Sequence, residues 1–448
     1  MKLISTFLTL TFFTLNCFAH IEALFHPYDN TLEKISEIFL DAEDSIDMAL
    51  YNIGTQKGNP VYKTLASKPI QDRIQSGDLK VRIIFEGYAT KEENFEKMRK
   101  LEALGVDAKY LGIGKKMHHK FSIVDFSSDH QWLITGSANW SLSSQRNYNE
   151  NTLFFKNKSA LTTRFQNEFD LLWSQAKEYG KINSDEEPSF HTIPVPKKDN
   201  EGLKVKFNSD NFDVTARGFR KSKHTTYVLT REIVQAINEA EDLIEIATTR
   251  IKLRPIYEAL LEAAERGVKI KLVVTMGEFK PNFLRKKTKI KPCSNAYNKK
   301  CSTSQNFAIF LTDLDYPGKE NVEVRAKFFD MRHDQYLQKQ MHSKYILVDN
   351  AKLLTGSFNW SYSAEYNHFE NLIKLNSDKH QKVVDSFSDD FDQLWSLNRN
   401  LLSEKVNTLR SKKKIKCSFQ PMSLSFKEID SLLNAARKSH RRVNYSCF

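Results

Sequence analysis

The sequence has few cysteines, and their spacing argues against a zinc site. The chain of 448 residues contains five cysteines, and no two of them are separated by only two residues. Structural zinc sites in small modules normally use such closely spaced ligand pairs. We therefore expect no zinc centre built from cysteine, and no cofactor of any kind is required by the motifs described below.

Long apolar runs are also scarce, apart from one at the N-terminus. Residues 1–19 carry a single charge, Lys2, followed by an apolar run from Leu3 to about Phe18. The small residue Ala19, with Cys17 two positions before it, is typical of a signal-peptidase site, so residues 1–19 are predicted to be a signal peptide and the mature chain to begin at His20. The run is short for a membrane span and no strong stop-transfer charge follows, which disfavours an uncleaved anchor. The bulky Asn16 disfavours a lipid attached at Cys17.

Export would leave four cysteines, an even number that permits two disulfides in an oxidising compartment. Proximity in the sequence suggests the pairs Cys293–Cys301 and Cys417–Cys447. Four cysteines allow three connectivities, so this pairing is an expectation from proximity alone. The predicted location is secreted or periplasmic.

Acidic residues are fewer than basic ones, with 55 Asp and Glu against 67 Lys and Arg and a formal net charge of +12. A basic surface attracts polyanions, which here means nucleic acid or an anionic phospholipid membrane. Solvated surface lysines without such a partner are the alternative. The 40% apolar content is sufficient for two cores of ordinary size, so the length indicates two or three domains.

The most informative feature of the chain is a long internal repeat. Residues 117–125 read MHHKFSIVD and residues 341–349 read MHSKYILVD. Upstream, DAEDSIDMA at 41–49 corresponds to EAEDLIEIA at 239–247, and downstream GSANW corresponds to GSFNW. A glutamate follows each GSxN asparagine after 11 residues. Each copy ends in an amphipathic helix. We assign the aromatic residues of these helices to the core: Phe165, Trp173, Phe387 and Trp395.

The periodicity of the apolar residues predicts an α/β fold. Helical patterns cover 32–42 and 230–240, and strand patterns cover 80–86 and 269–275. A glycine that ends a helix precedes each strand, Gly77 before the first and Gly267 before the second. The second copy is about 35 residues longer between its strand and its histidine. The predicted units are a first lobe at 20–185, a proline-containing linker at 186–204, a second lobe at 205–401 with a basic, cysteine-containing insertion at about 280–335, and a basic tail at 402–448. The tail either folds back onto the second lobe or is solvated surface.

The repeated polar residues suit chemistry at a phosphate group. A histidine and a lysine two positions apart on a strand face the same side, so His118 with Lys120 can converge on one anion, as can His342 with Lys344. The amides of Asn139 and Asn359 would add neutral donors, and Ser137 and Ser357 could add a hydroxyl or a backbone donor. A single H-x-K pattern would be weak evidence, because it is more often a surface lysine beside an incidental histidine. Two copies in register make coincidence very improbable.

Two histidines are useful because they can act in opposite protonation states. One can attack phosphorus while the other protonates the leaving oxygen, which gives a physical reason for the duplication. We expect Glu150 and Glu370 each to hold the outer ring nitrogen of the histidine in its own half. With the lysines and asparagines around the phosphate, no metal is required. The aspartates Asp125 and Asp349 are expected to support the site through backbone hydrogen bonds, and His119, out of phase on the strand, is not assigned to catalysis.

These residues resemble the phospholipase D superfamily, whose hallmark is H-x-K-x4-D followed by G-S-x-N. Both copies are intact, and the resemblance covers about 21–401. The first copy, with NYNEN at 147–151, is especially similar to the branch of the mitochondrial cardiolipin hydrolase and small bacterial endonucleases. The resemblance implies two lobes, each a mixed sheet flanked by helices, with the site in the cleft between them, and metal-free phosphodiester hydrolysis or transfer through a phosphohistidine. It also implies a monomer, with His118 as nucleophile and His342 as acid.

The motifs do not identify the substrate. A secreted nuclease acting on DNA or RNA is favoured by the positive charge and by the branch resemblance. A phospholipase D acting on phospholipid head groups is the alternative, since an anionic membrane attracts the same charge. A cardiolipin synthase is disfavoured because no transmembrane pair occurs near the start. A binding protein with a dead site is disfavoured because neither half has lost a catalytic residue.

Overall fold

The structure is a computed structural model, and it describes residues 20–87, 91–111, 116–179, 191–197, 202–215, 218–222, 226–276, 293–298, 306–328, 339–410 and 420–438. The predicted signal peptide lies outside these residues. Cys293 is described, whereas Cys301, Cys417 and Cys447 are not, so the disulfide pairing stays a prediction.

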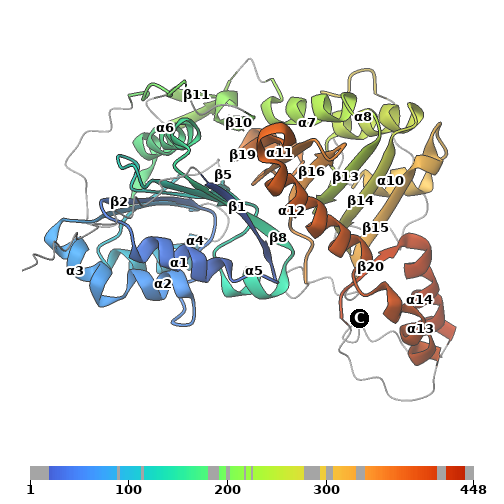
Figure 1. Cartoon of the computed structure of the whole chain (residues 1–448), viewed down its shortest axis with the longest axis horizontal. Helices are drawn as coiled ribbons and strands as arrows, with labels where there is room; N and C mark the ends of the chain where they lie inside the picture. Colours follow the sequence, from blue (N-terminus) through green and yellow to red (C-terminus); the bar gives the residue numbers. More distant parts are fainter. Residues whose placement is uncertain are drawn as a thin grey trace, which may run out of the picture.

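The described chain forms two lobes, each built on an eight-stranded mixed sheet (Figure 1). The strands of the first sheet, in spatial order, are β1 (His20–His26), β8 (Glu150–Lys156), β7 (Trp132–Gly136), β6 (Lys120–Val124), β2 (Ser45–Leu50), β3 (Lys80–Phe85), β4 (Asp107–Tyr110) and β9 (Lys177–Glu178). Those of the second are β10 (Leu203–Phe207), β19 (Asn371–Asn376), β17 (Lys352–Gly356), β16 (Lys344–Val348), β13 (Leu243–Thr248), β14 (Lys269–Thr275), β15 (Val322–Phe328) and β20 (Met422–Ser425).

The two sheets have the same topology, which confirms the α/β repeat. In the first, β2, β3 and β4 pair in parallel, while β2–β6, β6–β7, β7–β8 and β8–β1 pair antiparallel. The second sheet repeats these directions from β10 to β15. Two short ladders lie outside the sheets: β11 (Phe212–Thr215) pairs with β12 (Gly218–Lys221), and β5 (Lys116–Met117) pairs with β18 (His368–Phe369) of the other lobe.

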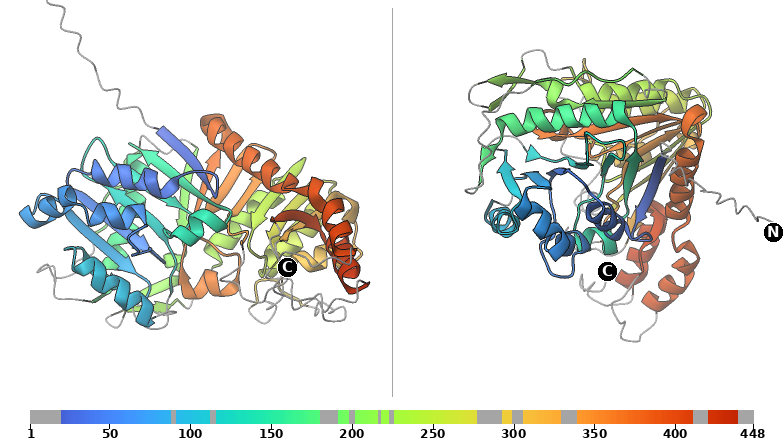
Figure 2. Two further views of the ribbon diagram at one scale, coloured as in Figure 1. Left: turned by 90° about the horizontal axis from the view of Figure 1, so that it is seen from below. Right: turned by 60° about the vertical axis from the view of Figure 1, so that its left-hand side comes forward.

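Helices cover both faces of each sheet and create three apolar clusters. One cluster lies within the first lobe and one within the second, while the third is shared and includes side chains of α6, α12 and strands of both sheets. Helix α6 contacts β10 and helix α12 contacts β1, so each lobe's closing helix packs on the other lobe (Figures 1 and 2). The helices are α1 (Thr31–Leu40), α2 (Pro60–Leu65), α3 (Lys68–Ser76), α4 (Lys91–Glu102), α5 (Leu142–Asn147), α6 (Ser159–Gln175), α7 (Val228–Asn238), α8 (Arg254–Glu265), α10 (Ala308–Asp313), α11 (Tyr362–Asn367), α12 (Ser377–Ser396), α13 (Leu402–Arg410) and α14 (Phe426–Lys438), with short 3-10 turns at Asn208–Asn211, Lys319–Asn321 and Arg399–Leu401.

The predicted elements agree with the structure. Helices α1 and α7 and strands β3 and β14 occupy the predicted segments, and Gly77 and Gly267 follow helices with φ values of 84° and 93°. Such positive φ values favour glycine because it lacks a Cβ. Phe165 and Phe387 are fully buried, Trp173 is buried at 7% exposure, and Trp395 packs against the shared cluster.

The predicted boundaries of the second lobe differ from the structure in two places, and the described part of the tail follows one of its two predicted alternatives. Strand β15 lies within the predicted insertion at 280–335 but takes the sheet position that β4 has in the first lobe, so this part belongs to the repeated unit. Strand β10 begins at Leu203, inside the predicted linker. Strand β20 pairs antiparallel with β15, so the described part of the tail folds back onto the second lobe, where it completes the sheet as β9 does in the first.

None of the described helices combines the length and the apolar character that a membrane crossing requires.

Candidate active site

Both histidines of the repeated motif lie just before a central strand, at the contact between the lobes. Strand β6 begins at Lys120 and β16 at Lys344, so each histidine precedes its strand by two residues. The backbone N–H of His118 donates to the carbonyl of Phe369 at 3.2 Å, and that of His342 donates to the carbonyl of Asn149 at 2.9 Å. Each histidine is therefore fixed by backbone of the opposite lobe.

The glutamates also act across the lobes, which corrects the prediction that each holds the histidine of its own half. The Nδ1 atom of His118 lies 2.9 Å from the carboxylate of Glu370, and Nδ1 of His342 contacts the carboxylate of Glu150. The backbone carbonyl of the residue before each glutamate accepts a hydrogen bond from the backbone N–H of the other lobe's histidine. This contact places the carboxylate beside the histidine ring of the other lobe. Spacing along the chain could not reveal this exchange, because it depends on how the lobes pack.

The GSxN serines hold these glutamates in place rather than donating into the site. The Ser137 hydroxyl accepts from the backbone N–H of Asn151 at 2.9 Å, and the Ser357 hydroxyl accepts from Asn371 at 3.0 Å. Both serines are fully buried. They fix the strand segment that follows each glutamate, and a hydroxyl or backbone donor from Ser137 or Ser357 to a phosphate stays a prediction.

Two further groups of the first lobe hold Glu150. The hydroxyl of Ser144, on α5, donates to its carboxylate, and Nδ1 of His26 lies 3.7 Å from it. At the equivalent position in the second lobe, the backbone N–H of Glu370 donates to Oδ1 of Asn208 at 2.8 Å. Sequence reasoning missed His26, Ser144 and Asn208. The internal repeat offers no signal for them, since His26 and Asn208 correspond in the two sheets yet differ in residue type.

Both carboxylates stay ionised in this setting. Burial on its own would raise their pKa values, but the electrostatic interaction and the hydrogen bond with the facing histidine outweigh it. The pKa of Glu150 is lowered to about 2, and that of Glu370 is lowered further still. An ionised carboxylate accepts, so the facing histidine carries its proton on Nδ1 and leaves the Nε2 lone pair free.

The two lysines lie beside the histidine rings. The Nζ of Lys120 donates to the carbonyl of His118 at 2.6 Å and lies 3.2 Å from its Nδ1, and Lys344 repeats this geometry with His342 at 2.6 and 3.2 Å. Burial lowers the pKa of Lys120 to about 7 and that of Lys344 to about 8. Lys344 acts electrostatically on Lys120, and both glutamates act on each lysine, so the four groups lie close together.

Burial also lowers the pKa values of both histidines. The pKa of His342 falls to about 4, because burial and the charge of Lys344 outweigh the attraction of Glu150. Burial lowers the pKa of His118 well below its usual range, and this effect exceeds the opposing attraction of the Glu370 carboxylate. Both rings are therefore neutral at pH 7 when the site is empty.

One of the two asparagines contacts the histidine of the opposite lobe. The Nδ2 of Asn359, from the second lobe, lies 3.4 Å from Nε2 of His118. Its counterpart Asn139 has a buried Oδ1 for which the described residues offer no hydrogen-bond partner. An amide donor facing Nε2 agrees with a neutral His118 that carries its lone pair on this atom.

The aspartates have the supporting role that was predicted. Asp125 accepts hydrogen bonds from the backbone N–H groups of residues 43–45 at 2.8–3.1 Å, and Asp349 from those of 241–243 at 2.8–2.9 Å. Both have φ near 52°. They tie the end of each central strand to the start of β2 or β13. His119 is also buried and structural: its Nε2 lies 3.1 Å from Glu168 and its Nδ1 lies 3.0 Å from Nδ2 of Asn371.

Aromatic residues flank the histidines unequally. Tyr51 lies 4.8 Å from the His118 ring between centroids, with Nζ of Lys116 at 4.6 Å from the tyrosine ring. His368 lies 5.6 Å from the same histidine, whereas its counterpart near His342 is Tyr148, at 6.0 Å. Ligand atoms of His118, His368 and Glu370 fall within 4.8 Å of one another, the one such grouping among the described residues that could hold a metal ion.

Comparison with known proteins agrees with this architecture. The family described as "Cardiolipin synthase, PLD-like domain" matches residues 35–173 and 233–395, which is more than half of the chain and includes both motif copies. The chain therefore belongs to the phospholipase D superfamily.

Individual relatives match shorter parts of this chain than the family does. The mitochondrial cardiolipin hydrolase of Canis lupus familiaris is 32% identical over 88 residues, 19% of this chain and 33% of that protein. A phospholipase D of Rickettsia prowazekii is 26% identical over 158 residues, 35% of this chain and 58% of that protein. The chain thus spans a third of the length of the cardiolipin hydrolase and little more than half of the phospholipase D. The solved structure of phosphatidylserine synthase from Haemophilus influenzae shares the fold, with a TM-score of 0.56, 14% identity and coverage of 83% and 85%.

Proposed function

We propose that the protein is an exported, monomeric phosphodiesterase that cleaves nucleic acid through a covalent phosphohistidine, at one site to which both lobes contribute. The observation that carries this proposal is the crossed pairing of His118 with Glu370 and of His342 with Glu150. Because each histidine is oriented by the other lobe, neither lobe holds a complete site alone. Export rests on the predicted signal peptide at residues 1–19.

The first step transfers the phosphoryl group to a histidine. The Nε2 lone pair of His118 attacks phosphorus and forms a P–N bond while the P–O bond to the leaving group breaks. The leaving oxygen takes a proton from Nε2 of His342, which must first be protonated. The negative phosphodiester raises the pKa of the His342 ring from about 4 when it binds, because opposite charge stabilises the imidazolium.

The second step releases the product. Neutral His342 takes a proton from water as the water oxygen attacks phosphorus, the P–N bond breaks, and His118 recovers its lone pair. Glu370 stabilises the positive charge that His118 carries in the intermediate, and Glu150 does the same for His342. Each glutamate also fixes the Nδ1–H tautomer, so Nε2 faces the substrate in both rings.

Lys120, Lys344 and the two GSxN asparagines would hold the phosphate oxygens. Both lysines lie beside the histidine rings, and charge-assisted hydrogen bonds to phosphate are stronger than neutral ones. These donors stabilise the charge that develops in the transition state, which supports a mechanism without a metal ion.

Two features support nucleic acid as the substrate. The chain carries a net charge of +12, which attracts a polyanion. Among the described residues, the exposed large apolar side chains are Tyr28, Leu40 and Val214, which belong to a loop, a helix and a hairpin and form no common patch. An enzyme that works on a membrane surface usually presents a contiguous apolar area. The described surface thus favours a soluble polyanion over a bilayer.

The alternative is a phospholipase D that hydrolyses phospholipid head groups. It is supported by the names of two relatives, a cardiolipin hydrolase and a phospholipase D. The same two histidines would perform the same steps, so the alternatives differ only in what binds around the scissile phosphate.

A direct comparison of substrates tests the proposal. The purified protein is given DNA, RNA and vesicles containing cardiolipin and phosphatidylcholine, all in EDTA, with the His118→Asn variant as control. We expect cleavage of nucleic acid, intact lipid, and no turnover by the variant.

Cleavage of lipid with intact nucleic acid would overturn the nuclease proposal in favour of the phospholipase D. Loss of all activity in EDTA, with recovery on adding a divalent metal, would overturn the metal-independent mechanism. Trapping a 32P-labelled protein whose label is acid-labile and base-stable, and is absent from His118→Asn, would support the phosphohistidine.

A further inference from the structure

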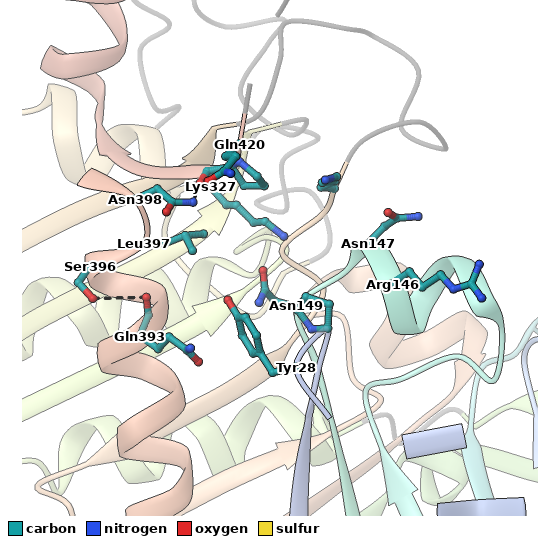
Figure 3. A pocket seen from close by; sticks show the side chains of 13 residues that line it. Tyr28, Arg146, Asn147, Asn149, Lys327, Gln393, Ser396, Leu397, Asn398 and Gln420 are labelled. Carbon is teal, nitrogen blue, oxygen red and sulfur yellow. Dashed lines mark hydrogen bonds between the residues drawn. The ribbon is translucent and has the colours of Figure 1, made fainter. Parts of the chain in front are cut away.

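A cavity of about 560 Å³ lies between the lobes and is lined by residues of both (Figure 3), and the histidines and lysines of the candidate site are not among them. The first lobe contributes the segment after β1, with Tyr28, and the end of α5. The second lobe contributes β15, the C-terminal end of α12 and the segment before β20. None of the side chains described for the catalytic steps lines it.

The charged groups that line the cavity are all cations. They are Arg146 from the first lobe and Lys327 and Lys339 from the second, and none of the lining residues is an aspartate or a glutamate. The remaining lining is mostly amide and hydroxyl side chains, such as Asn147, Gln393 and Ser396 (Figure 3). Guanidinium, ammonium and amide donors without a carboxylate are a typical phosphate-binding set.

Lys327 is the unusual member because it is 4% exposed. Its Nζ donates to the backbone carbonyl of Gln340 at 3.1 Å. The carboxylates that act on it electrostatically, Asp390 and Glu150, both have other hydrogen-bond donors: the hydroxyl of Tyr345 donates to Asp390 at 2.8 Å, and Glu150 faces His342. Burial, with the neighbouring Lys339, lowers the pKa of Lys327 to about 7. Burying an ammonium group with only a carbonyl acceptor destabilises the fold, so a binding role would explain why it is there.

One stretch of backbone separates this cavity from His342. The carbonyl of Gln340 accepts from Lys327 and also from the N–H of Asn149 at 3.0 Å, and the carbonyl of Asn149 accepts from the N–H of His342. Asn149 itself lines the cavity. The cavity and the surroundings of His342 therefore share this stretch of backbone as a common wall.

The first lobe has no such cation at the corresponding place. Phe85 pairs with Tyr110 and Val274 pairs with Ala326 at equivalent points of the two sheets, so the next residues, Leu111 and Lys327, correspond. Leu111 is buried in the shared apolar cluster. The repeat thus places an apolar side chain on one side of the site and a cation on the other.

We propose that this cavity is a second phosphate-binding subsite, which holds a backbone phosphate of the nucleic acid adjacent to the scissile one. The inference rests on the proposed nuclease function and deepens it, because it gives the two sides of the site different tasks. A strand bound this way enters the site in one direction, with its extra phosphate on the His342 side.

The test compares a substrate that has only the scissile phosphate with one that has several. Bis(p-nitrophenyl) phosphate supplies the first and a single-stranded oligonucleotide the second. Lys327→Leu introduces the residue of the first lobe, and Lys204→Gln, at an exposed position on β10, is the matched control for loss of one charge. We expect Lys327→Leu to lower the ratio of kcat/KM for the oligonucleotide to kcat/KM for bis(p-nitrophenyl) phosphate by about tenfold or more, the typical loss for a charged hydrogen bond. Lys204→Gln should leave the ratio unchanged.

A binding measurement tests the second phosphate subsite without depending on turnover. In the His118→Asn background, fluorescence anisotropy with a labelled oligonucleotide should show about tenfold weaker binding for Lys327→Leu, and a slope of log affinity against log salt reduced by about one. Arg146→Gln, at an exposed position near the end of α5, should act in the same direction and guards against a folding defect in the first variant. Thermal unfolding should show Lys327→Leu to be as stable as the parent or more so, since it removes a buried cation.

The outcomes separate the two proposals. If the oligonucleotide and bis(p-nitrophenyl) phosphate are both left intact by the parent protein, the proposed function fails. If both are cleaved but Lys327→Leu and Arg146→Gln leave the ratio and the affinity unchanged, the second subsite is overturned while the nuclease stands. A lower melting temperature of Lys327→Leu with unchanged affinity would assign Lys327 a structural role and would also overturn the subsite.

Discussion

The two lobes are closely alike where they meet the scissile phosphate and unlike just beside it. Histidine, lysine and glutamate recur in both with the same contacts to one another, and Asp125 and Asp349 accept hydrogen bonds from three corresponding backbone donors. Next to the catalytic histidines, however, His119 corresponds to Ser343. His119 contacts Glu168, whereas in the second lobe the hydroxyl of Tyr345 donates to Asp390.

The likeness and the difference have separate causes. Each lobe supplies the glutamate for the other lobe's histidine, so a change in one copy would damage a group held by the other, and the shared residues are constrained together. The flanking residues do not exchange a carboxylate in this way, and there Tyr148 corresponds to His368 and Leu111 to Lys327. A site whose repeated residues are alike but whose neighbouring residues differ can bind a substrate in one direction only. A single direction of binding is needed if His118 and His342 have the opposite roles proposed for them.

The largest expected effect comes from replacing the two histidines separately. His118→Asn should lower turnover by at least about 10³-fold on every substrate, because no nucleophile remains. His342→Asn should lose about 10²- to 10⁴-fold on an oligonucleotide but should still release up to one equivalent of p-nitrophenol from bis(p-nitrophenyl) phosphate, whose leaving group needs no proton. Stopped-flow absorbance measures this burst. A burst from His118→Asn and none from His342→Asn would reverse the assigned roles.

The crossed glutamates give the next largest effect. Glu370→Gln should reduce kcat by about 10²-fold, because the amide no longer fixes the tautomer and charge of His118 in the other lobe. Glu150→Gln should do the same through His342. Histidine side-chain NMR reports which ring changes: Glu370→Gln should shift the signals of His118 far more than those of His342. The opposite pattern would mean that each glutamate serves its own lobe.

A smaller effect is expected from pH. The pKa values of Lys120 and Lys344 are lowered by burial to about 7 and about 8, so both are charged below pH 7 and lose their protons as the pH rises through that range. Since the lost charges bind phosphate, KM should rise by several-fold between pH 6.5 and 9. The inhibition constant of sulfate, whose own charge is constant over this range, should rise in parallel. A KM and a sulfate constant that stay level would contradict the role given to the lysines.

The smallest effect concerns stability and separates the two aspartates. Asp125→Asn and Asp349→Asn should each lower the free energy of unfolding by about 1–3 kcal/mol, because an amide accepts three backbone hydrogen bonds less well than a carboxylate. Asp125 is 3% exposed and Asp349 is partly exposed, so Asp125→Asn should lower the free energy of unfolding more than Asp349→Asn does. Urea unfolding measures the difference. Equal costs, or loss of turnover in a fully folded variant, would argue against a purely supporting role.

Much of the site could be predicted from the sequence because the chain contains it twice. The repeat identified the histidines, lysines, asparagines and glutamates, and strand periodicity placed β3 and β14 correctly. It did not reveal that β15 and β20 complete the second sheet, because an insertion and a basic tail mask the correspondence with β4 and β9. The contributions of His26, Ser144 and Asn208 to holding the glutamates were also missed, since they come from segments that the repeat does not mark.

The sequence alone determined the chemistry available to this protein: two histidine bases, two ammonium groups and two carboxylates, each repeated at or beside an apolar strand. The tertiary structure decided which carboxylate serves which histidine. Packing α6 on β10 and α12 on β1 brings the segment before each glutamate against the other lobe's histidine, and hydrogen bonds follow distance in space rather than separation along the chain. The cavity that contains Lys327 has the same origin, because its walls come from both lobes and exist only once they are packed together.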